Sequence, residues 1–472
     1  MSELSLRLRG RSLGLATGLA IVALTFVVAP GRALAIGETI TDVRILDNQR
    51  TEESTVRSIA GLANGELLEA DTLDKVRERL NTSGLFADVN VWWEPHGEGV
   101  RVNIAVKDKF PWAPVPTASW SANNKSLGLL FVHGNLFGRG KQLALGGRLA
   151  TVDSGATLAY RDPALFGSWA YWQLQGLVQR QVVPEYDSFG LGTLSDPQEI
   201  RETTFTSYGF DLAFGIAWLR RVKTQVSWHL ERFNFDKSDN PNDPNLLLAP
   251  SMQGGVLGVG RAALSFDFRA REFAVLTGAA LTGYVDYASP AFKSDYKMYR
   301  GGVIWEQGIK FLRRHNFVYS AGAFAGHDLP FFAENTAGGP NLRGYLYQQF
   351  RGDTQLSGKA EYHFPLFSIG SMDFRGLGFY DIAAVWFREI PTGAAPITDA
   401  GGNSYFPRDT YDQRTFPVTL PSGFSFNQSV HSSVGVGLRF FLRSVAVPLI
   451  GVDVGWGIED NLHPQYLIVI GA

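Results

Sequence analysis

Residues 208–218 read Tyr208-Gly209-Phe210-Asp211-Leu212-Ala213-Phe214-Gly215-Ile216-Ala217-Trp218. Large apolar and aromatic side chains occupy every second position, and small or charged residues occupy most of the positions between them. A period of two residues is typical of a β-strand, because successive side chains point to opposite faces of a sheet. This segment is therefore predicted to be a strand with one apolar face and one polar face.

The same period returns in segments of about ten residues from position 111 to the end of the sequence. Three further clear cases are residues 222–231, 355–364 and 434–440. Short turns such as Gly138-Arg139-Gly140 alternate with long connections such as residues 327–352, and counting the turns gives about 16 strands. Short turns at one end and long loops at the other are typical of a transmembrane β-barrel.

The two faces of these strands indicate what surrounds them. One phase carries the aromatic residues, whereas the other mixes charged residues with glycine. Lipid outside and a polar lumen inside produce this distribution, and a membrane sheet must close so that every backbone group is paired. No run of about 18 apolar residues follows the first 35 residues, so any membrane crossing must use strands. Residues 111–472 are therefore predicted to form a transmembrane β-barrel of about 16 antiparallel strands.

The first 35 residues have the composition of an export signal. Arginines at positions 7, 9 and 11 precede a mostly apolar stretch over residues 13–28, and Ala33-Leu34-Ala35 is a small-residue cleavage site. The apolar stretch is short for a membrane anchor, which favours a cleaved signal peptide. Residues 1–35 are expected to be removed, so that the mature, exported chain begins near Ile36.

Composition and motifs exclude several classes of function. The formal net charge of −2 gives no case for a nucleic-acid partner. The sequence contains no cysteine, which excludes disulfides, thiolate metal ligands and a cysteine nucleophile. The signatures of serine hydrolases and zinc peptidases are missing, and residues 138–142 lack the spacing and the hydroxyl of a phosphate-binding loop. We therefore expect a protein that is not an enzyme and that uses no cofactor or metal.

Residues 36–110 follow another pattern, which predicts a small α+β domain with the element order βααββ. Strands are predicted over residues 40–46, 87–93 and 100–106. Acidic residues after Thr51 open a short first helix, and Asp71 is the predicted N-cap of a second helix that Gly84 ends. The predicted fold is thus mainly β, with this domain in front of the barrel.

One long connection contains an arginine among glycines, in the stretch Gly338-Gly339-Pro340-Asn341-Leu342-Arg343-Gly344-Tyr345. Taken alone, it would be an exposed glycine-rich loop. Glycines also permit positive φ and close backbone approach, which suits a loop packed inside the barrel that carries one guanidinium to a fixed partner.

Several of these stretches resemble the superfamily of outer-membrane assembly and translocation barrels that includes BamA, TamA, the mitochondrial Sam barrel and two-partner secretion transporters. Residues 36–110 resemble its periplasmic POTRA domain, in a single copy, most clearly at Gly84, Leu85 and Phe86. Asn135 and Gly138, Asp162 and Pro163, and Asp267 and Arg269 lie in stretches that resemble barrel motifs of the family. Residues 341–345 resemble its most diagnostic motif, a loop that folds back into the lumen.

In that superfamily, the arginine of the loop meets an acidic residue on the inner wall two strands later. The matching stretch here is residues 378–383, where Asp381 shares the inward phase with Phe379 and Ala383. The resemblance therefore implies a lumenal latch formed by Arg343, Gly344 and Tyr345 with Asp381. Two departures are that the family usually has glycine in place of Ala383 and commonly ends in an aromatic residue, whereas this sequence ends in Ala472.

The resemblance implies a protein of the bacterial outer membrane with its POTRA domain in the periplasm. Its implied partners are unfolded client proteins, either outer-membrane or secreted, together with outer-membrane lipid and accessory periplasmic or lipoprotein subunits. The leading hypothesis is that the POTRA domain binds a client and the first-to-last strand seam of the barrel inserts it into the membrane. The alternative is a secretion pore, although such transporters usually carry two POTRA domains and a plug helix. A diffusion porin would need neither the POTRA domain nor the arginine loop.

Overall fold

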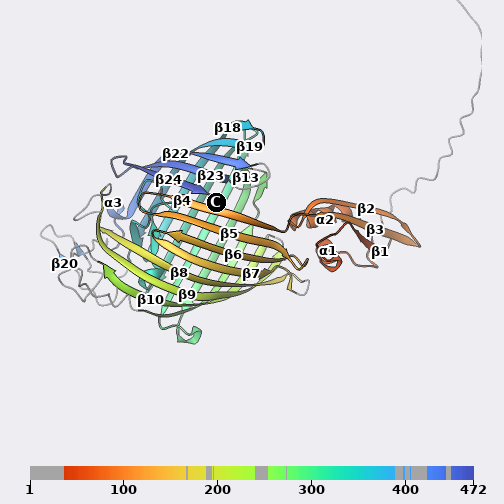
Figure 1. The fold of residues 1–472 in the computed structure, drawn as a ribbon, viewed down its shortest axis with the longest axis horizontal. Helices are drawn as coiled ribbons and strands as arrows, with labels where there is room; N and C mark the ends of the chain where they lie inside the picture. Colours follow the sequence, from red (N-terminus) through yellow and green to blue (C-terminus); the bar gives the residue numbers. More distant parts are fainter. Residues whose placement is uncertain are drawn as a thin grey trace, which may run out of the picture.

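The computed structural model describes residues 37–165, 168–187, 194, 196–219, 221–239, 254–272, 274–388, 397–398, 404–405, 423–442 and 448–471. The expected signal peptide of residues 1–35 lies outside the described residues. Figure 1 shows a large barrel with a small N-terminal unit projecting from one end, so that the two lie along the long axis of the molecule. Among the described residues, no helix is long and apolar enough to cross a membrane.

The N-terminal unit contains the predicted order of one strand, two helices and two strands. Its elements are β1 (Ile40–Leu46), α1 (Glu53–Ala60), α2 (Thr72–Thr82), β2 (Phe86–His96) and β3 (Gly99–Asp108). The sheet order is β1-β3-β2, with β1 parallel to β3 and β2 antiparallel to it. Residues four apart on each helix, Val56 with Ala60 and Val76 with Leu80, are buried and form a core with the apolar face of the sheet.

Two local predictions for this unit need correction. The strands β2 and β3 extend beyond the predicted residues 87–93 and 100–106, because their ladder continues to the turn at residues 97–98. Asp71 does occupy the N-cap position of α2, but its side chain makes no capping hydrogen bond. Its backbone (φ −102°, ψ 0°) is not in the extended conformation typical of a cap, and its carboxylate lies 2.8 Å from the Lys75 ammonium instead.

The barrel is closed, and all neighbouring strands are antiparallel. Its segments are β4 (Trp112–Trp120), β5 (Lys125–Leu136), β6 (Lys141–Ala150), β7 (Asp153–Asp162), β8 (Ala170–Asp187), β9 (Gln198–Leu219), β10 (Val222–Asp239), β11 (Gly255–Asp267), β12 (Ala270–Glu272), β13 (Val275–Ala288), β14 (Met298–Phe311), β15 (His315–His327), β18 (Thr354–Ile369), β19 (Met372–Trp386), β22 (Val430–Leu442), β23 (Pro448–Gly457) and β24 (Pro464–Ile470). Because β11 and β12 both pair with β13, they are two parts of one strand. The barrel therefore has 16 strands, which confirms the predicted fold class.

The remaining elements are short. The long connection between β15 and β18 contains the 3₁₀ turn η4 (Phe331–Ala333) and the strands β16 (Asn335–Ala337) and β17 (Phe350–Gly352), which pair with each other. Elsewhere lie η3 (Pro290–Phe292), β20 (Ile397–Thr398), β21 (Ser404–Tyr405) and α3 (Phe426–Ser429).

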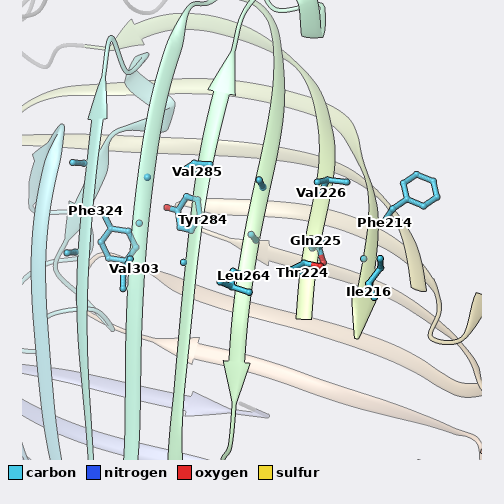
Figure 2. A pocket seen from close by; sticks show the side chains of 18 of the residues that line it. Phe214, Ile216, Thr224, Gln225, Val226, Leu264, Tyr284, Val285, Val303 and Phe324 are labelled. Carbon is cyan, nitrogen blue, oxygen red and sulfur yellow. The ribbon is translucent and has the colours of Figure 1, made fainter. Parts of the chain in front are cut away.

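Side-chain exposure confirms which phase of the strands faces outward. On β9, Tyr208 and Phe214 from the apolar phase are about half exposed, whereas Ser207 and Ala213 from the other phase are fully buried. Small outward residues on neighbouring strands, among them Gly283, leave an apolar depression of about 1010 Å³ on the outer surface. Figure 2 shows side chains that line it, including outward residues of β9, β10, β11, β13 and β14. This outer surface is apolar, as contact with lipid requires.

Stability of the N-terminal unit is predicted to depend on its helix–sheet core. Replacing Leu80, which is fully buried, by alanine removes packed atoms and leaves a cavity, so Leu80→Ala should lower the free energy of unfolding of this unit by about 2–5 kcal/mol. Glu78→Ala changes an exposed position of the same helix and should shift it by less than about 0.5 kcal/mol. Pulse proteolysis of the full-length protein in urea measures both, and equal midpoints for the two variants would contradict the prediction.

Candidate functional site

The loop of residues 338–349, between β16 and β17, is folded into the barrel. Leu342, Arg343 and Tyr345 are all at least 95% buried. The glycines make this conformation accessible, because Gly338, Gly339 and Gly344 have φ values of 121°, 64° and 98°. At Gly344 a Cβ atom would lie 2.8 Å from the backbone nitrogen of Gly457, so the loop backbone lies directly against β23. The loop is therefore packed inside the barrel instead of being exposed.

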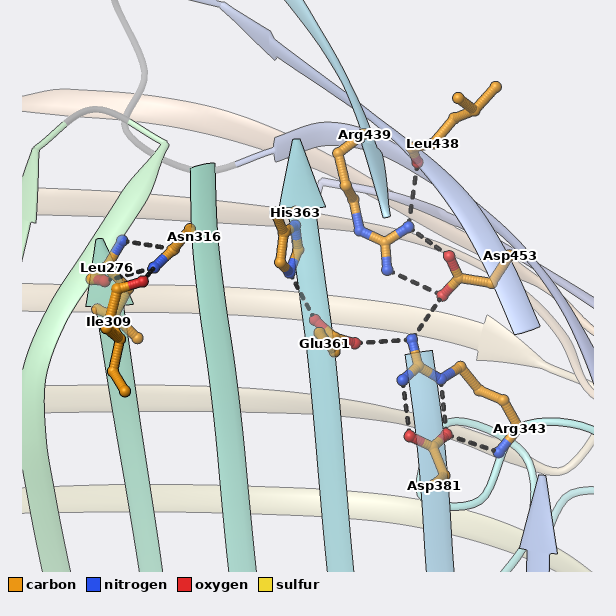
Figure 3. Close-up of polar contacts among 10 residues, drawn as sticks. All are labelled: Leu276, Ile309, Asn316, Arg343, Glu361, His363, Asp381, Leu438, Arg439 and Asp453. Carbon is orange, nitrogen blue, oxygen red and sulfur yellow. Dashed lines mark hydrogen bonds and ion pairs between the residues drawn. The ribbon is translucent and has the colours of Figure 1, made fainter. Parts of the chain in front are cut away.

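Arg343 forms a two-pronged ion pair with Asp381, as Figure 3 shows. Its Nε lies 2.7 Å from Asp381 Oδ2 and its Nη2 lies 2.7 Å from Oδ1. The backbone N–H of Arg343 also donates to Oδ2, at 3.2 Å. Asp381 stands on the inward phase of β19 and is fully buried, so the structure brings these two sequence-predicted residues together.

Two further carboxylates contact the same guanidinium, and sequence reasoning did not identify them as partners. Arg343 Nη1 lies 2.7 Å from Glu361 Oε1 on β18 and 3.2 Å from Asp453 Oδ2 on β23. Arg439 binds Asp453 through two hydrogen bonds, and His363 lies 2.8 Å from Glu361 (Figure 3). The sequence pattern did indicate that Glu361 faces the lumen. Which of the inward-facing charged residues come into contact depends on the register between strands, which the pattern does not give.

The charges of this cluster are balanced. Arg343, Arg439 and Lys359 face the carboxylates of Asp381, Glu361 and Asp453. Lys359 Nζ donates to the carbonyl oxygen of Pro340 in the loop, at 2.7 Å. The guanidinium also lies 3.5 Å from the centre of the Phe379 ring, an attractive cation–π geometry. Buried charges are stable only when they are paired in this way, so the loop position is held by a set of partners on three strands.

Tyr345 attaches the loop to the wall on the other side of Gly344. Its hydroxyl lies 3.1 Å from the carbonyl oxygen of Ser432 on β22 and 2.5 Å from Glu459 Oε2 in the turn after β23. Its ring packs against Phe350 at a centroid distance of 5.3 Å. Arg343, Gly344 and Tyr345 thus contact adjacent parts of β22 and β23.

Asn135 and Gly138 lie at the junction between the barrel and the N-terminal unit. Asn135 Nδ2 donates to Thr51 Oγ1 at 2.8 Å, and Asn135 Oδ1 accepts from the N–H of Gly140 at 2.8 Å. The carbonyl oxygen of Gly138 accepts from the N–H of Glu52 at 2.9 Å. Gly138 has φ 70°, and a Cβ there would lie 2.3 Å from the carbonyl oxygen of Arg50. This turn therefore fixes the N-terminal unit against the barrel.

Asp108 extends this junction inside the N-terminal unit. Its carboxylate accepts hydrogen bonds from the Thr51 hydroxyl and from the N–H groups of Gln49 and Arg50, the latter two at 2.8 Å. Burial raises the pKa of Asp108, but these hydrogen bonds outweigh burial and hold its pKa below the usual value. The Asp108 carboxylate thus fixes residues 49–51, including the Thr51 hydroxyl that accepts the hydrogen bond from Asn135.

The other sequence-predicted residues have separate, local partners. Asp162 lies 3.1 Å from the Lys141 ammonium and precedes Pro163 at the end of β7, and Arg269 lies 2.9 Å from Asp267 and 2.6 Å from Glu306. In the N-terminal unit, Gly84 has φ 76° after α2, Leu85 packs against the core and Phe86 is buried in it. None of the contacts described for these residues involves Arg343.

Within the described ranges, no group of three or more His, Asp or Glu residues is arranged to hold a metal ion.

Comparison with known proteins identifies the family. The model of the Omp85 superfamily domain matches residues 135–458. No curated protein matches the chain.

Solved structures with this fold include BamA from Haemophilus ducreyi lacking POTRA domains 1–3. It has a TM-score of 0.62 and 14% identity, over 92% of this chain and 84% of that one. CdiB from Escherichia coli has a TM-score of 0.61 and 12% identity, over 92% and 76% of the two chains. CdiB from Acinetobacter baumannii has a TM-score of 0.56 and 13% identity, over 92% and 74%.

At these identities, the solved structures show a shared fold. The family match covers more than half of the sequence and includes the loop with Arg343 and the wall with Asp381. The chain therefore belongs to the Omp85 superfamily of outer-membrane β-barrels.

Proposed function

We propose that this protein inserts β-barrel client proteins into the bacterial outer membrane. In this proposal the signal peptide is removed, and residues 36–110 act as a POTRA domain that binds unfolded clients in the periplasm. The barrel then provides the site of insertion at the seam between its first and last strands, β4 and β24. The reaction is non-enzymatic and uses no cofactor, since client folding and strand pairing supply the free energy.

The observation that carries the proposal is the short seam. β4 and β24 pair over three residue pairs, Ile468 with Trp120, Val469 with Ser119 and Ile470 with Ala118. Among the described residues, β23 and β24 pair over seven, and β4 and β5 over nine. Opening the wall here breaks fewer backbone hydrogen bonds than opening it at either neighbouring junction of the described strands, so a client strand gains access to the membrane at lower cost at the seam.

The N-terminal unit supports a role in client binding. In the sheet order β1-β3-β2, the strand β2 lies at an edge and pairs only with β3 among the described strands. An edge strand presents unpaired backbone groups to which an extended segment can add. Unfolded outer-membrane proteins contain such segments, and this edge is the proposed binding surface for them.

Client insertion can be separated from secretion by reconstitution. We expect the purified protein in liposomes to integrate and fold an unfolded barrel client, measured by heat-modifiable migration and protease protection. A soluble exported client should not enter the liposomes, and protein-free liposomes serve as the control. Passage of the soluble client without folding of the barrel client would contradict insertion and support the secretion pore.

The lumenal ion pair can be tested by a double-mutant cycle. Arg343→Ala leaves Asp381 buried without its main partner, so this variant should lose about 3–5 kcal/mol of barrel stability, and less where water enters the lumen. Asp381→Ala should cost less, because Arg343 keeps Glu361 and Asp453. The double variant should resemble Arg343→Ala alone, because the two residues act as one unit.

Urea unfolding in detergent micelles and client insertion in liposomes are the two measurements for this cycle. Arg271→Ala, at an exposed position of β12, is the matched arginine control and should leave both unchanged. Additive losses of stability in the double variant would show that Arg343 and Asp381 act independently, against the proposed latch.

A further inference from the structure

The phases of β4 and β24 show which of their backbone groups face the seam. The N–H of Gly134 donates to the carbonyl oxygen of Pro111, and the N–H of Ser121 donates to that of Asn124. Pro111 lies directly before β4 and Ser121 directly after it, and both are odd-numbered. Each is hydrogen-bonded to β5 or to the turn that leads into β5. Because successive residues of a strand bond to opposite neighbours, the even-numbered residues of β4 direct their backbone groups toward the seam.

Prolines occupy key positions in that phase. Pro114 and Pro116 are even-numbered residues of β4, so the seam-facing edge lacks an N–H donor at both. On β24, the N–H of Gly471 donates to Leu449 in line with β23, which places the even-numbered Pro464 on the seam phase as well.

In the register of the seam, the ladder stops at the pair of Ala118 with Ile470, which is the last residue of β24. The next seam-facing residue of β4 is Pro116, which has no N–H to donate, whereas Pro464 lies in line with the turn after β4. The seam thus has few residue pairs, and contacts outside the ladder contribute to its closure.

The lumenal loop contacts the hairpin on one side of the seam. On β23, which pairs with β24, Asp453 binds Arg343, and the backbone of residues 455–457 lies against Gly344. A Cβ at Gly455 would lie 2.8 Å from the backbone nitrogen of Gly344, so the approach is backbone to backbone. Tyr345 adds the contact with Glu459 in the turn between β23 and β24.

The same loop contacts the hairpin on the other side of the seam through Asn123. This residue lies in the turn between β4 and β5, and its Oδ1 accepts from the N–H of Tyr347 at 2.9 Å. Its Nδ2 donates to the carbonyl oxygen of Tyr347 and to the hydroxyl of Tyr186 on β8, both at 3.1 Å. Both hydrogens of the amide and its oxygen are thus used, and two of the three bonds hold the loop.

Little space is left where these parts meet. A cavity of only about 10 Å³ lies between the loop, the β4–β5 turn and the β23–β24 hairpin. Its lining includes Asn123 from the first hairpin, Arg343 and Tyr345 from the loop, and Asp453 and Leu467 from the last. The loop is therefore packed against both hairpins at once.

We propose that residues 338–347 act as a clasp that closes the seam from the lumenal side, and that Asn123 is the positioning residue that joins the clasp to the first hairpin. Release of the two Asn123–Tyr347 hydrogen bonds frees β4 from the loop while Arg343 keeps the loop on the β23 side. The seam then retains only its three residue pairs. This inference rests on the proposed opening of the seam during client insertion, but its test requires no client.

Hydrogen exchange of the seam amides measures opening directly, because exchange of a paired amide follows the fraction of time that the pair is open. In liposomes, Asn123→Ala should raise the exchange rate of the peptides that contain residues 118–120 and 468–470 by about 5- to 30-fold, the factor that the loss of two ordinary hydrogen bonds gives. Asn123→Asp keeps the acceptor for the Tyr347 N–H but places a carboxylate oxygen against the Tyr347 carbonyl oxygen, so it should raise exchange as well. Asn124→Ala is the matched control, because the Asn124 side chain contacts Thr151 and leaves Tyr347 in place.

A cross-link provides the second measurement. Ser119 and Val469 face each other in the seam, and since odd-numbered residues of β4 bond toward β5, they form a non-hydrogen-bonded pair with closely spaced side chains. The natural sequence has no cysteine, so the pair Ser119→Cys and Val469→Cys gives a single disulfide. Oxidation of this pair should return the exchange of Asn123→Ala to the natural rate.

Natural exchange rates in a folded, heat-modifiable Asn123→Ala barrel would overturn the clasp. An equal rise in Asn124→Ala would also overturn it, since that variant keeps the contact. Raised exchange without any client insertion by the natural protein would support the clasp and refute the proposed function, so the two failures are distinguishable.

Discussion

Every backbone N–H and C=O of a strand in a bilayer needs a partner within the protein, because the hydrocarbon core offers none. Most neighbouring strands in this barrel meet that need with long antiparallel ladders, but β4 and β24 share only three residue pairs. The short ladder between β4 and β24 gives a physical reason for the position of the lumenal loop. On the lumenal side of this junction, the loop adds side-chain and backbone contacts to the three residue pairs that the two strands share.

The charged cluster explains why such a loop adopts one position. Arg343 takes its carboxylates from β18, β19 and β23, and a displaced loop would leave Asp381 without its ion-pair partner while Glu361 and Asp453 would each lose one partner. Partial release is therefore unfavourable, because each unpaired charge carries its own desolvation penalty. The hydrogen bonds of Asn123 involve only neutral groups and break at lower cost, so the two attachments of the loop differ in strength.

Much of the fold was predictable from the sequence, because the two-residue period in stretches such as residues 208–218 assigns each side chain to lipid or lumen independently of the rest of the chain. The same rule predicted that Asp381 faces the lumen. The resemblance to the family then indicated Arg343 as its partner. Glu361 and Asp453 were not predicted as partners, because their depth along the wall depends on the register of several strands. The contact between Asn135 and Thr51 joins residues 84 positions apart, and no local pattern reports it. The orientation of Pro114 was likewise hidden until the pairing of β4 with β5 was known.

The junction at Asn135 has a mechanical consequence. The N-terminal unit leads from β3 directly into β4, the first lip of the seam, and is also hydrogen-bonded to the turn between β5 and β6. The unit is thus attached to the β4 side of the seam in two ways. It is covalently continuous with β4, and it is hydrogen-bonded to the turn between β5 and β6. A rotation of the unit relative to the barrel would therefore be transmitted as torque to the β4 side of the seam and not directly to the β24 side.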